Sequence, residues 1–322
     1  MQSEELLKQL RAGQMDITNL DVYFAYRLLL GRQPEFTSLE SYVARRGTSP
    51  VKDFVLEFLA SEEFSNVWSD LPALHRTGDL MIRTDLPNGI VLNFFARDWA
   101  IGWHIAMRNF ERVTEDVIRT YVTPNCVSLD IGSNIGYFTM LMAKLGAKKV
   151  YALEPFAAVF GILLRNIKDN ELTNVIAVQK AADQDSQTRV RIHYEEAGFN
   201  TGSSFIPACE DSAIALKHPY VEVETITADN LIPSSERVAF VKLDVEGSEL
   251  KALRGMTRIL SQDRPVLLVE CNPFCLKTMA GVTPEALVSE LRGHRYRLLT
   301  EQQEEFVLDR SDTVRNILCL PE

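Results

Sequence analysis

Two kinds of hydrophobic spacing divide the chain. Near its start, apolar residues such as Leu6, Leu7 and Leu10 recur at intervals of three and four, as on the buried face of a helix. The same spacing continues to about residue 65, with almost no strand pattern. We therefore predict a small all-helical domain over residues 1–70.

Residues 71–97 interrupt the helical pattern. Pro87-Asn88-Gly89 lies between two apolar runs and is typical of a tight hairpin turn. We expect a linker and a first pair of strands in this segment. The second domain is predicted over residues 98–322.

From Asn125 onward, short β-rich runs alternate with helical ones. The runs include CVSLDI, KVYALE, NVIAVQ, RVRIHY, VEVETI, VAFVKLD, PVLLVE, YRLLT and NILCL. Helices are predicted over residues 137–145, 157–169, 248–260 and 284–293. This alternation favours an α/β fold with a doubly wound, mostly parallel sheet, which binds ligands at the carboxyl ends of its strands.

Charge and composition exclude several classes of function. The formal net charge of −10 disfavours a sequence-independent grip on nucleic acid. No apolar run reaches the length of a membrane helix, and the first residues lack the apolar core of a signal peptide. The five cysteines have no CxxC spacing, which is typical of buried reduced thiols. We expect a cytoplasmic protein without a nucleic-acid partner or a membrane span.

The turn in VSLDIGSNIGYFTM is the first candidate ligand site. A strand ends near Asp130, and Gly132 and Gly136 flank a turn into a helix. The glycines permit close backbone approach, and the helix start offers free N–H groups. The turn lacks the Lys-Ser/Thr of a phosphate-binding loop and the GxGxxG register of dinucleotide enzymes. Asp130 would repel a pyrophosphate and suit the amino group of a methionine moiety.

Acidic and small residues follow the next two predicted strands. Glu154 ends the second strand, where a carboxylate can accept hydrogen bonds from both hydroxyls of an adenosine ribose. After the third strand, Ala182 leaves room for a flat base and Asp183 can bond its exocyclic amine. Together these positions favour S-adenosylmethionine over a dinucleotide.

Carboxylates also follow the later strands. Asp244, Glu246 and Glu249 come after VAFVKL, and Glu270 comes near the end of the next strand. The start of a helix stabilises carboxylates, but that role does not require three of them. Methyl transfer to a hydroxyl benefits from a general base. We take the first three as candidate bases and Glu270 as the group that orients the hydroxyl.

A metal-dependent version of this site is the alternative. Asp244, Glu270 and Asn272 would supply hard oxygen ligands, which favour magnesium. We predict no metal, and keep magnesium as the less favoured possibility.

Over residues 98–320 the chain resembles the FkbM-type methyltransferases. Five ordered motifs carry the resemblance: Asn109-Phe110-Glu111, LDIGSNIGYFT from Leu129, Glu154-Pro155, NTGSS from Asn200 and VKLDVEGSE from Val241. The resemblance implies a Rossmann-like class I methyltransferase fold, with cofactor contacts from Glu111, Asp130, Gly132, Asn134, Glu154 and Asp183. Ser248 stands where histidine is common in the family, which puts a role for histidine there in doubt.

Together, the turn, the strand ends and the resemblance define one predicted site. Its cofactor-binding residues are Glu111, Asp130, Gly132, Ser133, Asn134, Gly136, Glu154, Ala182, Asp183 and Asp244, and its catalytic residues are Asp244, Glu246, Glu249 and Glu270.

The leading hypothesis is O-methylation of a sugar hydroxyl in a glycan, polysaccharide or glycosylated metabolite. The N-terminal LLGRQP and FLASEEF are similar to a small helical domain often found beside carbohydrate-modifying enzymes. The alternatives are a non-catalytic cofactor-binding scaffold and an NAD-dependent oxidoreductase, and Asp130 argues against the latter. The acceptor, small molecule or glycan, and a homo-oligomeric state are left open.

Overall fold

A computed structural model describes most of the second predicted domain. The described residues are 81–95, 98, 101–107, 110–194, 204–212, 214–308 and 313–322. They belong to Leu80–Glu322, one of two compact units into which the chain divides. The predicted N-terminal helical domain lies outside the described residues, as do Asn109 and positions 200–203 of the NTGSS motif.

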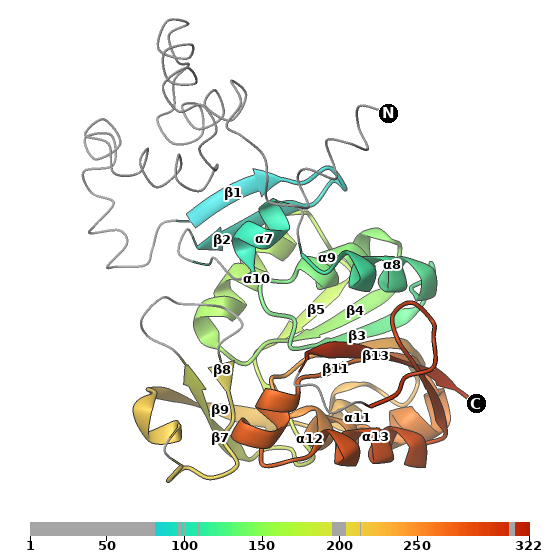
Figure 1. Cartoon of the computed structure of the whole chain (residues 1–322). Helices are drawn as coiled ribbons and strands as arrows, with labels where there is room; N and C mark the ends of the chain where they lie inside the picture. The colour runs from blue at the N-terminus through green and yellow to red at the C-terminus, as the bar shows by residue number, and fades with distance from the viewer. Residues whose placement is uncertain are drawn as a thin grey trace, which may run out of the picture. The chain divides into compact units, whose positions relative to one another are not determined.

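A seven-stranded sheet forms the centre of the unit, in the order β12-β13-β11-β10-β3-β4-β5 (Figure 1). The strands are β3 (Val127–Ile131), β4 (Lys149–Leu153), β5 (Val175–Val178), β10 (Val238–Leu243), β11 (Val266–Cys271), β12 (Tyr296–Leu299) and β13 (Arg315–Pro321). Of these described strands, β13 alone runs in the opposite direction to the other six. The predicted Rossmann-like, mostly parallel sheet is confirmed, with β10 directly beside β3.

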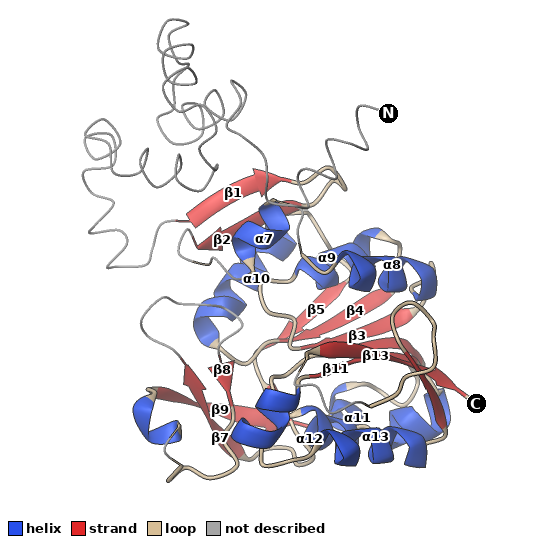
Figure 2. Cartoon of the chain, in the orientation of Figure 1, coloured by secondary structure: helices blue, strands red, loops and turns tan. Residues whose placement is uncertain are grey.

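Helices cover both faces of this sheet (Figure 2). One face carries α8 (Arg112–Tyr121), α9 (Tyr137–Lys144) and α10 (Ala157–Asp169), and the other carries α11 (Ala228–Leu231), α12 (Glu249–Arg254) and α13 (Pro284–Gly293). Two apolar clusters fill these interfaces, one around Met140 and Ile162 and the other around Leu253 and Leu291. No described helix is long and apolar enough to cross a membrane.

The segment predicted as one helix over 248–260 is divided, so that prediction was wrong. Helix α12 ends at Arg254, and a π-helical turn spans Ile259–Asp263. The Asp229 carboxylate accepts hydrogen bonds from the backbone N–H groups of Arg258 and Ile259, which starts the chain in a new direction. A further π-helical turn covers Cys275–Met279.

The predicted hairpin is part of the same unit. Strands β1 (Met81–Asp85) and β2 (Val91–Phe95) pair in an antiparallel manner, and α7 (Gly102–Ala106) follows them. The buried Asn93 donates its backbone and side-chain N–H groups to Asn166 Oδ1 on α10, at 2.6 and 2.9 Å. These bonds fix β2 against α10.

A separate four-stranded sheet lies between β5 and β10 in the sequence. It consists of β6 (Ala181–Ala182), β7 (Arg189–Tyr194), β8 (Ser204–Phe205) and β9 (Tyr220–Ile226). Their order in the sheet is β6-β9-β7-β8. A 3₁₀ turn at Ala215–Lys217 precedes β9 in the sequence. The predicted strands RVRIHY and VEVETI therefore do not join the central sheet. Glu222 and Glu224 on β9 are paired with arginine and lysine, a pattern suited to a half-exposed sheet and not to a buried parallel one.

Candidate functional site

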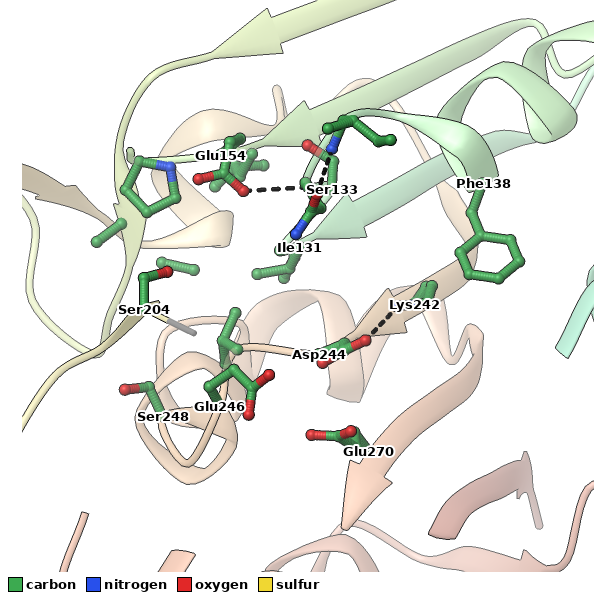
Figure 3. A pocket seen from close by; sticks show the side chains of 18 of the residues that line it. Ile131, Ser133, Phe138, Glu154, Ser204, Lys242, Asp244, Glu246, Ser248 and Glu270 are labelled. Carbon is green, nitrogen blue, oxygen red and sulfur yellow. Dashed lines mark hydrogen bonds and ion pairs between the residues drawn. The ribbon is translucent and has the colours of Figure 1, made fainter. Parts of the chain in front are cut away.

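A cavity of about 310 Å³ opens at the carboxyl ends of β3, β4, β10 and β11 (Figure 3). Apolar side chains of α9 and of the segment before α8 line the cavity, among them Phe138 and Phe110. The small sheet supplies another wall through Ala182, Ser204 and Phe205. Glu154 lies at one end of the view and Glu270 at the other.

Gly132 holds the turn after β3 against the end of β10. Its φ is +80°, and a Cβ atom there would lie 1.7 Å from the carbonyl oxygen of Asp244. The backbone N–H groups of Gly132 and Ser133 donate to Leu153 O on β4, at 3.0 and 2.9 Å. The glycine therefore serves the chain's own close packing, a need that the sequence spacing did not reveal.

Gly132→Ala is expected to lower the free energy of unfolding by about 2–3 kcal/mol, because the backbone is left-handed and the methyl group overlaps Asp244 O. Urea unfolding of the purified protein measures this. Gly161→Ala is the matched control, since Gly161 lies within α10 with no atom near its missing Cβ. It should stabilise the protein by about 0.5–1 kcal/mol. Equal effects of the two substitutions would contradict the packing role of Gly132.

Glu154 anchors the turn and faces the cavity. Its two carboxylate oxygens accept hydrogen bonds from the backbone N–H groups of Asn134 and Phe156, at 3.0 and 2.9 Å. Burial raises the pKa of Glu154 to about 7. Each carboxylate oxygen has a further lone pair for a ligand hydroxyl. Ser133, Asn134 and Ala182 also line the cavity.

Three predicted cofactor residues, Asp130, Gly136 and Asp183, are not among the described residues that line the cavity. Asp130 accepts a hydrogen bond from Thr139, and its buried Oδ1 has no partner among the described residues. Gly136 precedes α9, and Asp183 Oδ1 accepts from the N–H group of Gln184. Their direct contact with a cofactor stays a prediction.

Lys242 is a functional candidate that the sequence analysis missed. Its side chain is buried, Nζ lies 2.7 Å from Asp244 Oδ2, and the ammonium lies 5.1 Å from the centre of the Phe138 ring. Burial lowers the pKa of Lys242, but nearby Asp244, Glu111 and Asp130 outweigh that effect and raise it above its ordinary value. A lysine inside the apolar run VAFVKL was the available signal, since a buried lysine needs a charged partner.

Glu111 precedes α8 and lines the cavity. Burial raises its pKa, and the nearby Lys242 ammonium opposes that shift. The predicted cofactor residue Glu111 and the predicted catalytic residue Asp244 therefore share one buried cation.

Three carboxylates gather at the far end of the cavity. Asp244, Glu246 and Glu270 come from the ends of β10 and β11, and Figure 3 shows their side chains close to one another. Glu246 has a φ of +50°, and its Oε2 accepts a hydrogen bond from the Cys275 thiol at 3.1 Å. Glu270 Oε2 has no partner among the described residues. Burial first, and the charge of Asp244 second, raise the pKa of both glutamates.

Glu249, the fourth predicted catalytic residue, has different surroundings. It is fully buried and is not one of the described lining residues of the cavity. Its Oε1 accepts hydrogen bonds from the backbone N–H groups of Val245 and Gly247, both at 3.1 Å. The side chain thus closes the loop that carries Glu246. Burial raises the pKa of Glu249 to about 7.

Glu249→Gln is expected to flatten the dependence of stability on pH. A carboxyl group whose pKa is raised from 4.5 to about 7 on folding stabilises the protein below pH 4.5, and this contribution is lost as pH rises through 7. The shift corresponds to at most about 3 kcal/mol. Urea unfolding at pH 5, 6, 7 and 8 measures the loss. The exposed Glu285→Gln serves as control, and a slope in Glu249→Gln equal to that of wild type would contradict the expectation.

Two of the three residues proposed for magnesium have an oxygen atom engaged with the protein itself. Asp244 bonds Lys242, and Asn272 Oδ1 accepts from the N–H group of Cys275. Within the described ranges, no three His, Cys, Asp or Glu side chains are grouped to hold one metal ion. This arrangement does not support the magnesium alternative, and we propose no metal site.

Comparisons with known proteins agree with this geometry. The profile of the Methyltransferase FkbM domain matches residues 130–298, just over half of the chain. The hexuronic acid methyltransferase AglP of Haloferax volcanii is 29% identical over 207 residues, which cover 62% of this chain and 77% of that protein. Methyltransferase 1 of Beauveria bassiana is 30% identical over 145 residues, or 40% of this chain and 57% of that protein.

A solved structure, the methyltransferase FkbM of Methylobacillus flagellatus KT, is 16% identical with a TM-score of 0.39, covering 62% of this chain and 44% of the other. The profile match spans the glycine turn, Glu154 and the carboxylates at the ends of β10 and β11. The chain therefore belongs to the FkbM methyltransferase family.

Proposed function

We propose that this protein transfers a methyl group from S-adenosylmethionine to a sugar hydroxyl in a glycan, polysaccharide or glycosylated metabolite. The observation that carries the proposal is the single cavity. It joins the glycine turn and Glu154 at one end to Asp244, Glu246 and Glu270 at the other. In this proposal, one end of the cavity holds the nucleoside of the cofactor, and the other end presents carboxylates to the acceptor.

The residues of the first end fit S-adenosylmethionine. Glu154 can accept hydrogen bonds from ribose hydroxyls, and Ala182 leaves room for the base. Ser133 is 6% exposed, and its Oγ has no partner among the described residues, so it can bond a ligand. The carboxylates of Glu111 and Asp244 offer negative charge for the amino group and the sulfonium of the cofactor. The bound cofactor would supply an electrophilic methyl group on its sulfonium.

The residues of the second end fit a sugar hydroxyl. Asp244 bonds Lys242 and Glu249 bonds backbone N–H groups, which leaves Glu246 and Glu270 as the carboxyls most available to an acceptor. A raised pKa makes a carboxylate a stronger base. In our proposal Glu246 accepts the proton of the hydroxyl, and Glu270 orients the hydroxyl. Loss of this proton makes the oxygen a better nucleophile.

The sugar as acceptor is supported by similarity. One relative is named a hexuronic acid methyltransferase, and the alignment covers most of that protein. Phe205 and Ser204 also line the cavity and offer a ring and a hydroxyl for contact with a sugar. A cofactor-binding scaffold without catalysis is the second candidate. The presence of all four predicted catalytic carboxylates in this chain argues against it.

Glu154→Gln tests the cofactor end. Replacing the carboxylate removes hydrogen bonds to the ribose, each of about 1–3 kcal/mol with a charged acceptor, so the Kd for S-adenosylmethionine should rise at least about tenfold. Isothermal titration calorimetry measures this, and transfer of label from the cofactor to sugar glycosides tests turnover. The exposed Glu171→Gln is the control. Unchanged affinity in Glu154→Gln would contradict the assignment, and binding without transfer to any sugar would favour the scaffold.

A further inference from the structure

We infer that the acceptor is an uncharged sugar, and that the acidic end of the cavity disfavours sugar acids. The inference rests on the proposed function and specifies its substrate class. It concerns the charge of the group that Glu246 and Glu270 face, which similarity to a hexuronic acid methyltransferase does not determine.

The described lining of the cavity is rich in carboxylates and poor in available cations. Five acidic residues line it: Glu111, Glu154, Asp244, Glu246 and Glu270. The lining cations are two lysines, and no arginine or histidine is among the described lining residues.

Both lysines are already paired within the protein. Lys242 Nζ lies 2.7 Å from Asp244 Oδ2, and Lys180 Nζ lies 2.6 Å from Glu224 Oε1. A sugar carboxylate would have to take one of them from its partner. Recognition of a carboxylate usually depends on an arginine or lysine that is free to bond it.

Hydrogen-bonding capacity leads to the same conclusion. Ser133 Oγ and Glu270 Oε2 are buried polar atoms of the lining without partners among the described residues. A sugar hydroxyl can donate to either oxygen. An ionised sugar carboxylate only accepts, so it cannot donate to either oxygen. Burial first, and the negative charge of Asp244 second, raise the pKa of Glu246 and Glu270, and an added carboxylate would face the same charge.

Matched acceptors test the inference with the full-length protein. Labelled S-adenosylmethionine is offered with p-nitrophenyl glycosides of glucose, galactose and mannose, and with the corresponding uronides, in which a carboxylate replaces the hydroxymethyl group at C6. We expect transfer to at least one glycoside, with kcat/KM at least about 100-fold lower for its uronide. Equal or faster transfer to a uronide would overturn the inference and leave the proposed function standing. Transfer to no sugar at all would overturn the proposed function, and the inference with it.

A charge substitution provides a second test. Ser248 lines the cavity on the same loop as Glu246. Ser248→Lys should raise the ratio of uronide to glycoside turnover, while Ser248→Met, of similar length but uncharged, should not. Thermal unfolding and cofactor affinity report whether each variant folds. Ser204→Lys, at a less buried lining position, repeats the test if Ser248→Lys does not fold. An unchanged ratio in a folded lysine variant would argue against selection by charge.

Discussion

Lys242→Met is expected to lower the free energy of unfolding by about 3–5 kcal/mol and to abolish detectable methyl transfer. Removing one partner of a buried ion pair leaves the other charge without compensation. Here Lys242 forms an ion pair with Asp244, and it also lies near Glu111 and Asp130. Urea unfolding at pH 7 gives the stability, and transfer of labelled methyl gives the activity.

Lys149→Met is the matched control. Lys149 also lies on the central sheet and pairs with Glu236, but both side chains reach solvent, and such pairs contribute little to stability. The melting temperature of this variant should stay close to that of wild type. In the double variant Lys242→Met/Asp244→Asn, part of the lost stability should return. Strict additivity of the two single changes would contradict a coupled ion pair.

Glu246→Gln is expected to lower kcat by about 100- to 10,000-fold, the usual contribution of a positioned general base, and Glu270→Gln to lower it by less, because Glu270 orients the hydroxyl in our proposal. The amide keeps the size of the side chain but cannot accept a proton. Affinity for S-adenosylmethionine should stay within a few fold, since Glu154 and the glycine turn bind the cofactor in our proposal. Steady-state kinetics and calorimetry separate the two quantities.

Glu249→Gln serves as the comparison for these two variants. The glutamine oxygen can still accept the N–H groups of Val245 and Gly247, so kcat should fall far less than in Glu246→Gln. A larger fall in Glu249→Gln than in the other two variants would identify Glu249 as the base. It would also remove Glu246 from that role.

Periodicity and turn residues were sufficient for most of the fold. The hairpin at Asn88-Gly89 and the helices α9, α10 and α13 agree with the sequence within a residue. The prediction did not divide the strands into two sheets, although β7 and β9 alternate apolar and polar residues whereas the central strands β3, β4 and β10 are almost wholly buried. The break after Arg254 depends on Asp229, which is distant in sequence.

Most residues of the site could also be predicted from the sequence, but their different surroundings could not. Glu154, Asp244, Glu246 and Glu270 all line the cavity because each follows or ends a parallel strand. Lys242 lies opposite Asp130 in the register of β10 and β3, a neighbour that neither strand reveals by itself. Glu249 could not be distinguished from Glu246 by spacing, since only the folded loop directs one carboxylate to backbone N–H groups and the other to the cavity.

The separate sheet that walls the cavity has a consequence for protein engineering. Strands β7 and β8 contribute Ile192, Ser204 and Phe205 to the lining, yet they share no ladder with the strands that carry Glu154 and Glu246. Substitutions in β7 and β8 can therefore reshape the space for the acceptor while the glycine turn keeps its bonds to β4. A library of variants confined to these two strands would search for new acceptors without sacrificing cofactor affinity.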